Sequence, residues 1–305
     1  RGRYIVEGKR RGAIGDRLKA EAGIESQPFR QRTTLNLKLK TLNFMPLNQS
    51  SLKQSLAGRF IGHTLYYYEE IGSTNDEVFR LGMQGAPEGT AVIAERQSAG
   101  KGRMQRTWHS PPGANIYTSI LLRPRFSPGL APQISLAAGV AVAKTLEPYC
   151  PGRVFLKWPN DVQIGGKKVC GILTQMRTAG DAVDFVVAGI GVNVNWKRKE
   201  FPEDIRGIAT SLSMEAGREI SRLELIILLY ENLAKCYREL AQKGFAPVRK
   251  QWLERTAMLG KPVSVQFGKE TIRGEAVDLD EDGSLVLLAE GQKMVKVAAG
   301  DATVG

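Results

Sequence analysis

The sequence predicts an α+β protein in which a mixed β-sheet is flanked by helices and followed by a small C-terminal SH3-like β-barrel. Three observations support this fold class. Strand-like and helical segments alternate through one block that ends near residue 257. After Gly260 the pattern changes to short runs of alternating apolar and polar residues, separated by turns. The chain has 305 residues, enough for one large and one small domain.

We assign the large domain to residues 49–257. Its first strand has the aromatic composition typical of strands. A helix then opens at Ser73, where Thr74 and Glu77 fit a capping box. The strand-like runs occupy residues 64–71, 90–95, 115–122, 153–157, 168–176 and 183–190. The later helical patterns occupy residues 132–147, 222–243 and 246–257.

We assign the small domain to residues 258–305. Turn residues at Gly268 and at Gly283 separate its strands. The expected strands are residues 262–267, 270–278, 284–289 and 293–298. A barrel of about 45 residues has too small a core to be very stable alone, so we expect it to pack on the large domain.

The leading segment, residues 1–48, holds 11 Lys and Arg against 4 Asp and Glu, whereas the remainder holds 32 against 27. It lacks a sustained helical period, so we interpret it as a disordered extension or a remnant of expression. The functional alternative is a DNA-binding helix-turn-helix. Residues 12–24 could form one short helix, but three helices with a tight turn are not visible, so we expect no DNA partner.

The composition is that of an ordinary soluble protein, with 42% apolar and 24% charged residues. Cys150, Cys170 and Cys236 lack metal-ligand or redox spacing, so we expect buried thiols in a reducing cytoplasm. The only histidines are His63 and His109, which disfavours histidine metal sites and Ser-His-Asp chemistry. We identify no apolar run long enough to span a bilayer and no secretory signal, so we expect no membrane partner.

One loop favours an anionic ligand. Gly100 and Gly102 allow backbone N–H groups to turn toward an anion, and Lys101 and Arg103 add charge and directed donors. Trp108 follows as a flat apolar wall. The loop is not a P-loop, because Ser or Thr does not follow the lysine, and it is not a dinucleotide fingerprint. The alternative is a solvated basic loop.

Two other segments carry polar groups at the end of a strand or the start of a helix. Ser73 and its two successors offer free N–H groups at a helix start, for an anion or a polar head group; the alternative is simple capping. Pro159 fixes a turn that presents Lys157, Asn160 and Asp161 together. Such residues can contact phosphate, a base edge and a cation, although turn chemistry and a surface ion pair would explain them equally.

Glycines mark two more segments. A hairpin turn at residues 165–166 leads into a strand in which Gly171 indicates close approach to the backbone. Lys168 lies three residues earlier and would face the opposite side of a regular strand, so a shared ligand would have to lie at the strand end. The small residues around Gly191 and Asn193 again permit close approach of a ligand.

Taken in order, these segments resemble the biotin protein ligases, from about Gly58 to the end of the chain. The motifs that carry the resemblance are Ser73-Thr74-Asn75, Gln97 with Gly100-Lys101-Gly102-Arg103 and Trp108, Lys157-Trp158-Pro159-Asn160-Asp161, Lys168 with Gly171-Ile172-Leu173, and Gly191-Val192-Asn193. The resemblance implies a sheet like that of class II synthetases. It also implies that biotin and ATP form biotinyl-5′-AMP, which then modifies a lysine of a biotin carboxyl carrier protein.

The resemblance also implies roles for individual residues. The expected biotin-binding residues are Ser73, Thr74, Asn75, Gln97, Lys101, Gly102, Arg103, Lys168 and Gly171. The expected ATP-binding residues are Trp108, Lys157, Asn160, Asp161, Arg106 and Asn193. The expected catalytic cations are Lys168, Arg103 and Lys101, with Lys168 the first choice. We name no firm protein ligand for Mg²⁺, which ATP oxygens would mostly hold.

The loop departs from the family at one place. Many relatives continue it as Arg-Gly-Arg, but here it reads Met104-Gln105-Arg106. We expect altered loop closure with activity retained. The alternatives are a lipoate ligase-like enzyme, a biotin-responsive DNA-binding repressor and a non-catalytic binding relative. A homodimer formed through sheet edges is compatible with this fold, but no sequence feature demands it.

Overall fold

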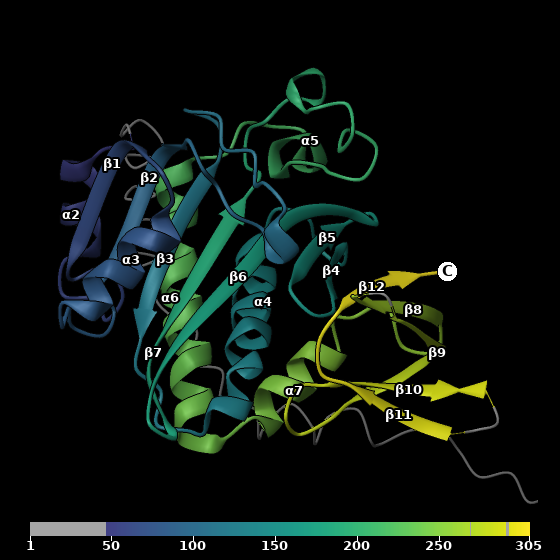
Figure 1. Cartoon of the computed structure of the whole chain (residues 1–305). Coiled ribbons are helices and arrows are strands. Elements are labelled where there is room, and N and C mark those ends of the chain that lie inside the picture. The colour runs from purple at the N-terminus through teal and green to yellow at the C-terminus, as the bar shows by residue number, and fades with distance from the viewer. Residues whose placement is uncertain (1–46, 269, 291–292) are drawn as a thin grey trace, which may run out of the picture. The chain divides into compact units, whose positions relative to one another are not determined.

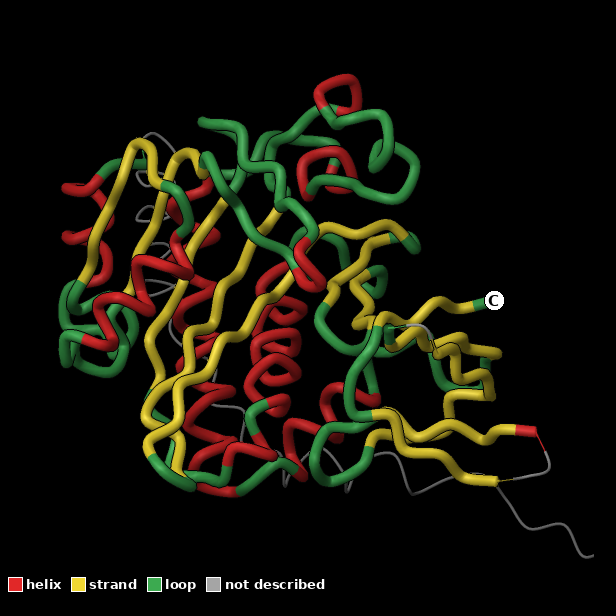
Figure 2. The backbone as a smooth tube through the Cα atoms, in the orientation of Figure 1, coloured by secondary structure: helices red, strands yellow, loops and turns green. Residues whose placement is uncertain are grey.

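The computed structural model describes residues 47–268, 270–290 and 293–305. The prediction of a disordered extension and the helix-turn-helix alternative concern residues that lie, apart from the last two, outside this part of the chain. Figures 1 and 2 show a large mixed sheet with helices on both faces and a smaller sheet formed by the C-terminal residues. The predicted α+β fold class is therefore confirmed.

The large sheet has seven strands in the order β1-β2-β3-β7-β6-β5-β4, and only β1 and β2 are parallel neighbours. These strands are β1 (Leu65–Ile71), β2 (Ala91–Gln97), β3 (Ile116–Leu122), β4 (Val154–Lys157), β5 (Asp161–Ile164), β6 (Lys167–Ala179) and β7 (Ala182–Val192). The strand β5 was not predicted, since its polar first residues read as a turn. The predicted hairpin turn joins β5 to β6, and Gly165 and Gly166 both have positive φ there.

Helices cover the two faces of the sheet unequally. One face packs on α2 (Gln49–Leu56), α4 (Pro132–Leu146), α6 (Arg222–Lys243) and α7 (Ala246–Leu253), which form one continuous apolar core with it. The other face is covered in part by α3 (Thr74–Met83), through a cluster that includes Val78, Leu121 and Phe185. Beside α3 (Figure 1) this face is open, and a cavity lies there.

The predicted capping box at the start of α3 is wrong. The N-cap is Ser73, not Thr74, and its side chain makes no capping hydrogen bond. Glu77 instead accepts hydrogen bonds from Arg80 and from Tyr68. The polar side chains at the first turn of α3 are therefore not used in capping and are available for contacts with other elements.

The central helix corrects one expectation from the sequence. The segment Pro128–Leu146 is long and apolar enough, by length and composition, to cross a membrane, against the prediction that no such run exists. In the fold, 72% of its most apolar stretch is buried. Its mean hydropathy reflects contacts on all sides, because α4 packs between the sheet and the helices α6 and α7.

The C-terminal residues form a five-stranded antiparallel sheet in the order β11-β10-β9-β8-β12. The strands are β8 (Pro262–Phe267), β9 (Glu270–Leu279), β10 (Leu285–Ala289), β11 (Lys293–Val297) and β12 (Asp301–Val304). The last strand was not predicted. As expected, this sheet packs on the large domain: Trp158 Nε1 donates a 3.1 Å hydrogen bond to the Gly283 carbonyl, and Arg249 of α7 pairs with Asp278.

The three cysteines are buried free thiols, as predicted. Burial raises the pKa of the Cys170 and Cys236 thiols, so both remain protonated at neutral pH. They are packing residues, since a buried neutral thiol is a poor nucleophile.

Candidate active site

The open face of the large sheet carries a cavity of about 920 Å³. Its walls are the start of α3, the Gly-Lys-Gly-Arg loop and the segment 204–209, and β8 and β12 of the C-terminal sheet border it. Its floor follows from strand register: Tyr117, Gly191, Gly171 and Asp161 pair in one row across β3, β7, β6 and β5. Residues paired across strands face the same side, so two adjacent glycines in that row leave a flat, open floor.

One end of the cavity is a buried polar network around α3. Thr74 donates from its backbone N–H and its hydroxyl to Gln97 Oε1, at 2.9 and 3.1 Å. Ser119 Oγ lies 2.8 Å from Thr74 Oγ1, and Gln97 Nε2 donates to Ser110 Oγ at 3.0 Å. The sequence predicted Ser73, Thr74 and Gln97 here, and the structure brings them together. Neither serine was predicted, because each belongs to a distant segment.

Asn75 belongs to the same network, but the protein itself uses its amide. Nδ2 donates to the Leu173 carbonyl and to Gln175 Oε1, both at 3.1 Å, and Oδ1 lies 2.6 Å from Ser119 Oγ. Asn75 also fills the space above Gly189, where a Cβ atom would lie 1.9 Å from Oδ1. Asn75 therefore shapes the α3 end of the cavity, in addition to any direct contact with a ligand.

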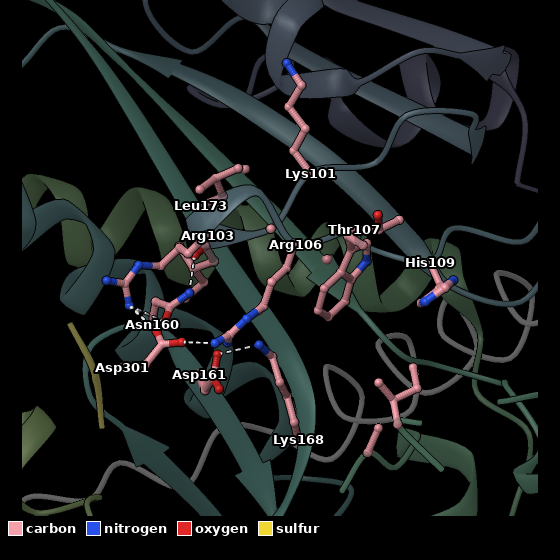
Figure 3. A pocket seen from close by; sticks show the side chains of 18 of the residues that line it. Lys101, Arg103, Arg106, Thr107, His109, Asn160, Asp161, Lys168, Leu173 and Asp301 are labelled. Atoms are coloured by element: carbon pink, nitrogen blue, oxygen red, sulfur yellow. Dashed lines mark hydrogen bonds and ion pairs between the residues drawn. The ribbon is translucent and has the colours of Figure 1, made fainter. Parts of the chain in front are cut away.

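The Gly-Lys-Gly-Arg loop crosses the cavity and sends its cations in two directions (Figure 3). Lys101 points away and pairs with Asp76 of α3 at 2.7 Å. Arg103 turns toward the floor, where Nη1 lies 3.2 Å from Asn160 Oδ1. Of the three predicted catalytic cations, Lys101 is thus directed toward α3 in this structure.

Trp108 lies on the glycine floor. A Cβ atom on Gly191 would be 2.5 Å from the indole Nε1, and one on Gly171 would be 2.8 Å from Cζ3. Lys168 Nζ stands 5.4 Å from the indole centroid, within the range of a cation–π contact. Within the described ranges no hydrogen-bond partner reaches the buried Nε1. The indole therefore has a donor available in the cavity.

The other end of the cavity concentrates charge. Lys168 Nζ lies 2.6 Å from Asp161 Oδ1, which places the first-choice catalytic cation beside an aspartate of the Lys-Trp-Pro-Asn-Asp segment. Lys168 and Gly171 face the same side of β6, contrary to the expectation for a regular strand, because a β-bulge interrupts the register between β5 and β6. Arg103 and Arg106 enter the same region from the loop (Figure 3).

The Lys-Trp-Pro-Asn-Asp segment presents its polar groups around a cis peptide bond between Trp158 and Pro159. Asn160 donates to the Ile172 carbonyl at 2.7 Å, while its Oδ1 accepts from Arg103. Lys157 lines the cavity as predicted. Asn193 also lines it, although its amide donates to the Thr210 carbonyl at 3.0 Å and thereby fixes the neighbouring segment.

Several lining residues were not predicted from the sequence. They are Ile205, Ile208 and Ala209 on the segment after β7, and Ser264, Gln266, Thr271 and Asp301 on the C-terminal sheet. Ile208 is 67% exposed although it borders the cavity, which suits contact with a flat apolar group. In the ranges that the structure describes, no three His, Cys, Asp or Glu side chains form a cluster that could hold a metal ion.

These features suit a small molecule with an uncharged polar head at the α3 end and an anionic group at the Lys168 end. A sequence profile of the Biotin/lipoate A/B protein ligase family matches residues 67–193. A profile of the Biotin protein ligase C terminal domain matches residues 258–305. Together the two matches span both sheets.

Curated relatives and solved structures agree with the profiles. The bifunctional ligase/repressor BirA of Bacillus subtilis is 37% identical over 259 residues, which are 85% of this chain and 79% of that protein. The biotin–[acetyl-CoA-carboxylase] ligase of Paracoccus denitrificans is 34% identical over 232 residues, covering 74% and 95%. The biotin protein ligase from Aquifex aeolicus in complex with biotin and ATP superimposes with a TM-score of 0.67 at 30% identity, covering 79% and 98%. The chain belongs to the biotin protein ligase family.

Proposed function

We propose that this protein is an ATP-dependent ligase that activates biotin and transfers it to a lysine of a biotin carboxyl carrier protein. In the first step a biotin carboxylate oxygen forms a bond to the α-phosphorus of ATP, and the bond to pyrophosphate breaks. In the second step the lysine amine attacks the acyl carbon of biotinyl-5′-AMP, AMP leaves, and the amine loses a proton. No covalent enzyme intermediate is needed, in keeping with a cavity built of cations and hydrogen-bond donors.

The observation that carries this proposal is the polarity of the cavity. A neutral hydrogen-bonding network formed by Thr74, Gln97 and Ser119 lies at one end, and the Lys168 ammonium lies near the Arg103 loop at the other. The first end matches a ureido head group. The second can neutralise both the carboxylate and the phosphate, whose mutual repulsion opposes the reaction.

We assign Lys168 the central role, as the cation that would lie between carboxylate and α-phosphate. Arg103 and Arg106 would contact phosphate oxygens, and Trp108 with Asn160 would border the adenine side. Mg²⁺ commonly binds one or two carboxylates together with nucleotide phosphates, and Asp161 is placed to be such a carboxylate. When bound, the ion would neutralise charge on the leaving pyrophosphate.

The test is biotin-dependent exchange of labelled pyrophosphate into ATP, with lipoate run in parallel. Lys168→Ala should lower the exchange rate by about 10²–10³-fold, as expected when one preorganised electrostatic group is removed. Lys167→Ala is the matched control, because it removes the neighbouring lysine and should leave the rate unchanged. Exchange with lipoate alone would transfer the substrate assignment to the lipoate ligases. Absence of exchange with both acids would refute the proposal.

Five further expectations belong to this proposal. The acceptor is a carrier protein of acetyl-CoA carboxylase type, the protein acts in the cytoplasm, and it binds neither DNA nor membranes. Self-association through sheet edges would give a homodimer. Biotinylation of a purified carrier domain, a gel mobility shift with DNA and sedimentation velocity test the expectations on the acceptor, on DNA and on self-association.

A further inference from the structure

The last strand of the C-terminal sheet contacts the Gly-Lys-Gly-Arg loop. The Asp301 carboxylate, at the start of β12, lies 2.5 Å from Arg106 Nη2 and 3.4 Å from Arg103 Nη1. Arg103 Nη2 also donates to the Gly300 carbonyl at 3.1 Å. A single strand therefore contacts both arginines of the loop (Figure 3), although about two hundred residues separate them in sequence.

The turn between the two arginines has an unfavourable backbone. Met104 and Gln105 both have left-handed backbone φ angles, 51° and 60°. Residues other than Gly, Asn and Asp rarely adopt this conformation. Met104 is 47% exposed, so burial of its side chain does little to hold the turn. A hydrogen bond from Gly102 N to Arg106 O closes the turn, and the arginine contacts to β12 tie it to the C-terminal sheet.

The backbone beside the arginines is closely packed against β8. The Gly300 φ is 136°, and a Cβ atom there would lie 2.6 Å from Val265 Cγ1 and 2.8 Å from the Gln266 carbonyl oxygen. Asp301 pairs with Gln266 across β12 and β8. This pairing places Asp301 at the edge of the cavity.

The electrostatics favour the same arrangement. Burial lowers the pKa of the Arg103 guanidinium, and the nearby carboxylates of Asp301 and Asp161 oppose that effect. Arg103 and Arg106 repel each other, and the shared carboxylate offsets this repulsion. Without it the two guanidinium groups would separate, and the strained turn would be free to change conformation.

We infer that Asp301 is a positioning residue for adenylation: it holds the Arg103 and Arg106 side chains, and the turn between them, at the phosphate end of the cavity before ATP binds. The inference rests on the proposed function for its link to ATP. Asp301 acts through the two arginines and has no required contact with substrate. The C-terminal sheet thereby contributes to ATP affinity, whereas the biotin end of the cavity is built without it.

Two measurements on Asp301→Asn test this role. The first is trypsin cleavage after Lys101, Arg103 and Arg106 in the unliganded full-length protein, followed by mass spectrometry. It needs no substrate, and the variant loop should be cut several times faster. The second is steady-state pyrophosphate exchange. The KM for ATP should rise about tenfold, the loss expected for one charge-assisted hydrogen bond, while the KM for biotin changes less than twofold.

Asp278→Asn is the matched control, because Asp278 is another carboxylate of the C-terminal sheet that pairs with an arginine of the large domain, Arg249, away from the loop. It should leave both measurements unchanged. Wild-type cleavage and KM values in Asp301→Asn would overturn the inference, and so would equal changes in both variants, which would reflect general loosening of the sheet. A wild-type protein without exchange activity would instead refute the proposed function, while the cleavage test would still decide whether Asp301 holds the loop.

Discussion

The Lys168 ammonium lies directly over Gly171. A Cβ atom on this glycine would be 3.3 Å from Nζ and 3.1 Å from Cε. Residues three apart in an unbroken strand face opposite sides, but Val169 has no partner on β5, since Val162 pairs with Cys170 and Gln163 with Lys168. The bulge thus places the cation on the same side of β6 as Gly171, whose row across the sheet ends at Asp161.

We predict that Gly171→Ala lowers kcat/KM for exchange by about 10–100-fold, because its methyl group would displace the Trp108 ring and Lys168, and small misplacements of catalytic groups are costly. The measurement is exchange kinetics combined with thermal unfolding, and Tm should change little, since the displaced groups border an open cavity.

Gly139→Ala in α4 is the control for this prediction. Its methyl group would meet Leu156 Cδ2 at 3.5 Å, an ordinary contact. The variant should keep full activity and gain about 0.5–1 kcal/mol of unfolding free energy, because alanine loses less entropy than glycine in a helix. Equal activity of Gly171→Ala and wild type would contradict the role assigned to the open floor.

A second prediction concerns Gly189, which faces Asn75. Gly189→Ala should force the Asn75 amide out of place, break its hydrogen bonds to Ser119 and Gln175, and raise the Kd for biotin at least about tenfold. Calorimetric titration with biotin measures this. The double variant with Asn75→Ala should bind biotin no worse than Gly189→Ala alone, because the clash is then gone. Additive losses would show that the two residues act independently.

The third prediction concerns the strained turn. Gln105→Gly should raise the free energy of unfolding by about 1 kcal/mol, because glycine adopts a φ near 60° without the steric cost that glutamine carries. Gln105→Ala is the control and should give no gain, since alanine has the same Cβ atom. Urea unfolding of the three proteins decides. A glycine variant no more stable than the alanine variant would mean that the turn is unstrained in solution.

The sequence alone predicted most of the large sheet, because period and strand composition are local properties that β2, β3, β6 and β7 express clearly. It also indicated the glycine floor. Gly171 and Gly191 stand where a strand would ordinarily carry apolar side chains, and glycines at such positions indicate close approach of another group to the backbone.

The features that the sequence could not predict depend on pairing between residues that lie far apart in the chain. The bulge at Val169 depends on backbone hydrogen bonds from Lys168 N to the Ile208 carbonyl and from Thr210 N to the Lys168 carbonyl, which no local pattern encodes. Asp301 joins the cavity because β12 pairs with β8. A lone aspartate four residues from the chain end carries no signal of that contact.

The fourth prediction concerns pH and Glu77, whose carboxylate lies at the first turn of α3. Arg80 Nη2 lies 2.6 Å from Oε1, and Tyr68 donates to the same oxygen at 2.9 Å. The hydrogen bonds from Arg80, and then that from Tyr68, lower the pKa of Glu77 in the folded protein, despite partial burial, which raises it. Folding therefore favours the charged form of this group.

Because the folded pKa lies below the unfolded value of about 4.3, Glu77 stabilises the fold above that pH, and this contribution is lost as pH falls through the folded pKa. Glu77→Gln should therefore lower Tm at neutral pH and have a smaller effect as pH falls through the folded pKa, because the wild-type carboxylate then becomes protonated. Thermal unfolding of both proteins between pH 7 and pH 3 measures the difference. A Tm difference that stays constant over this range would mean that Glu77 contributes through packing, since only a titrating carboxylate makes the two curves converge.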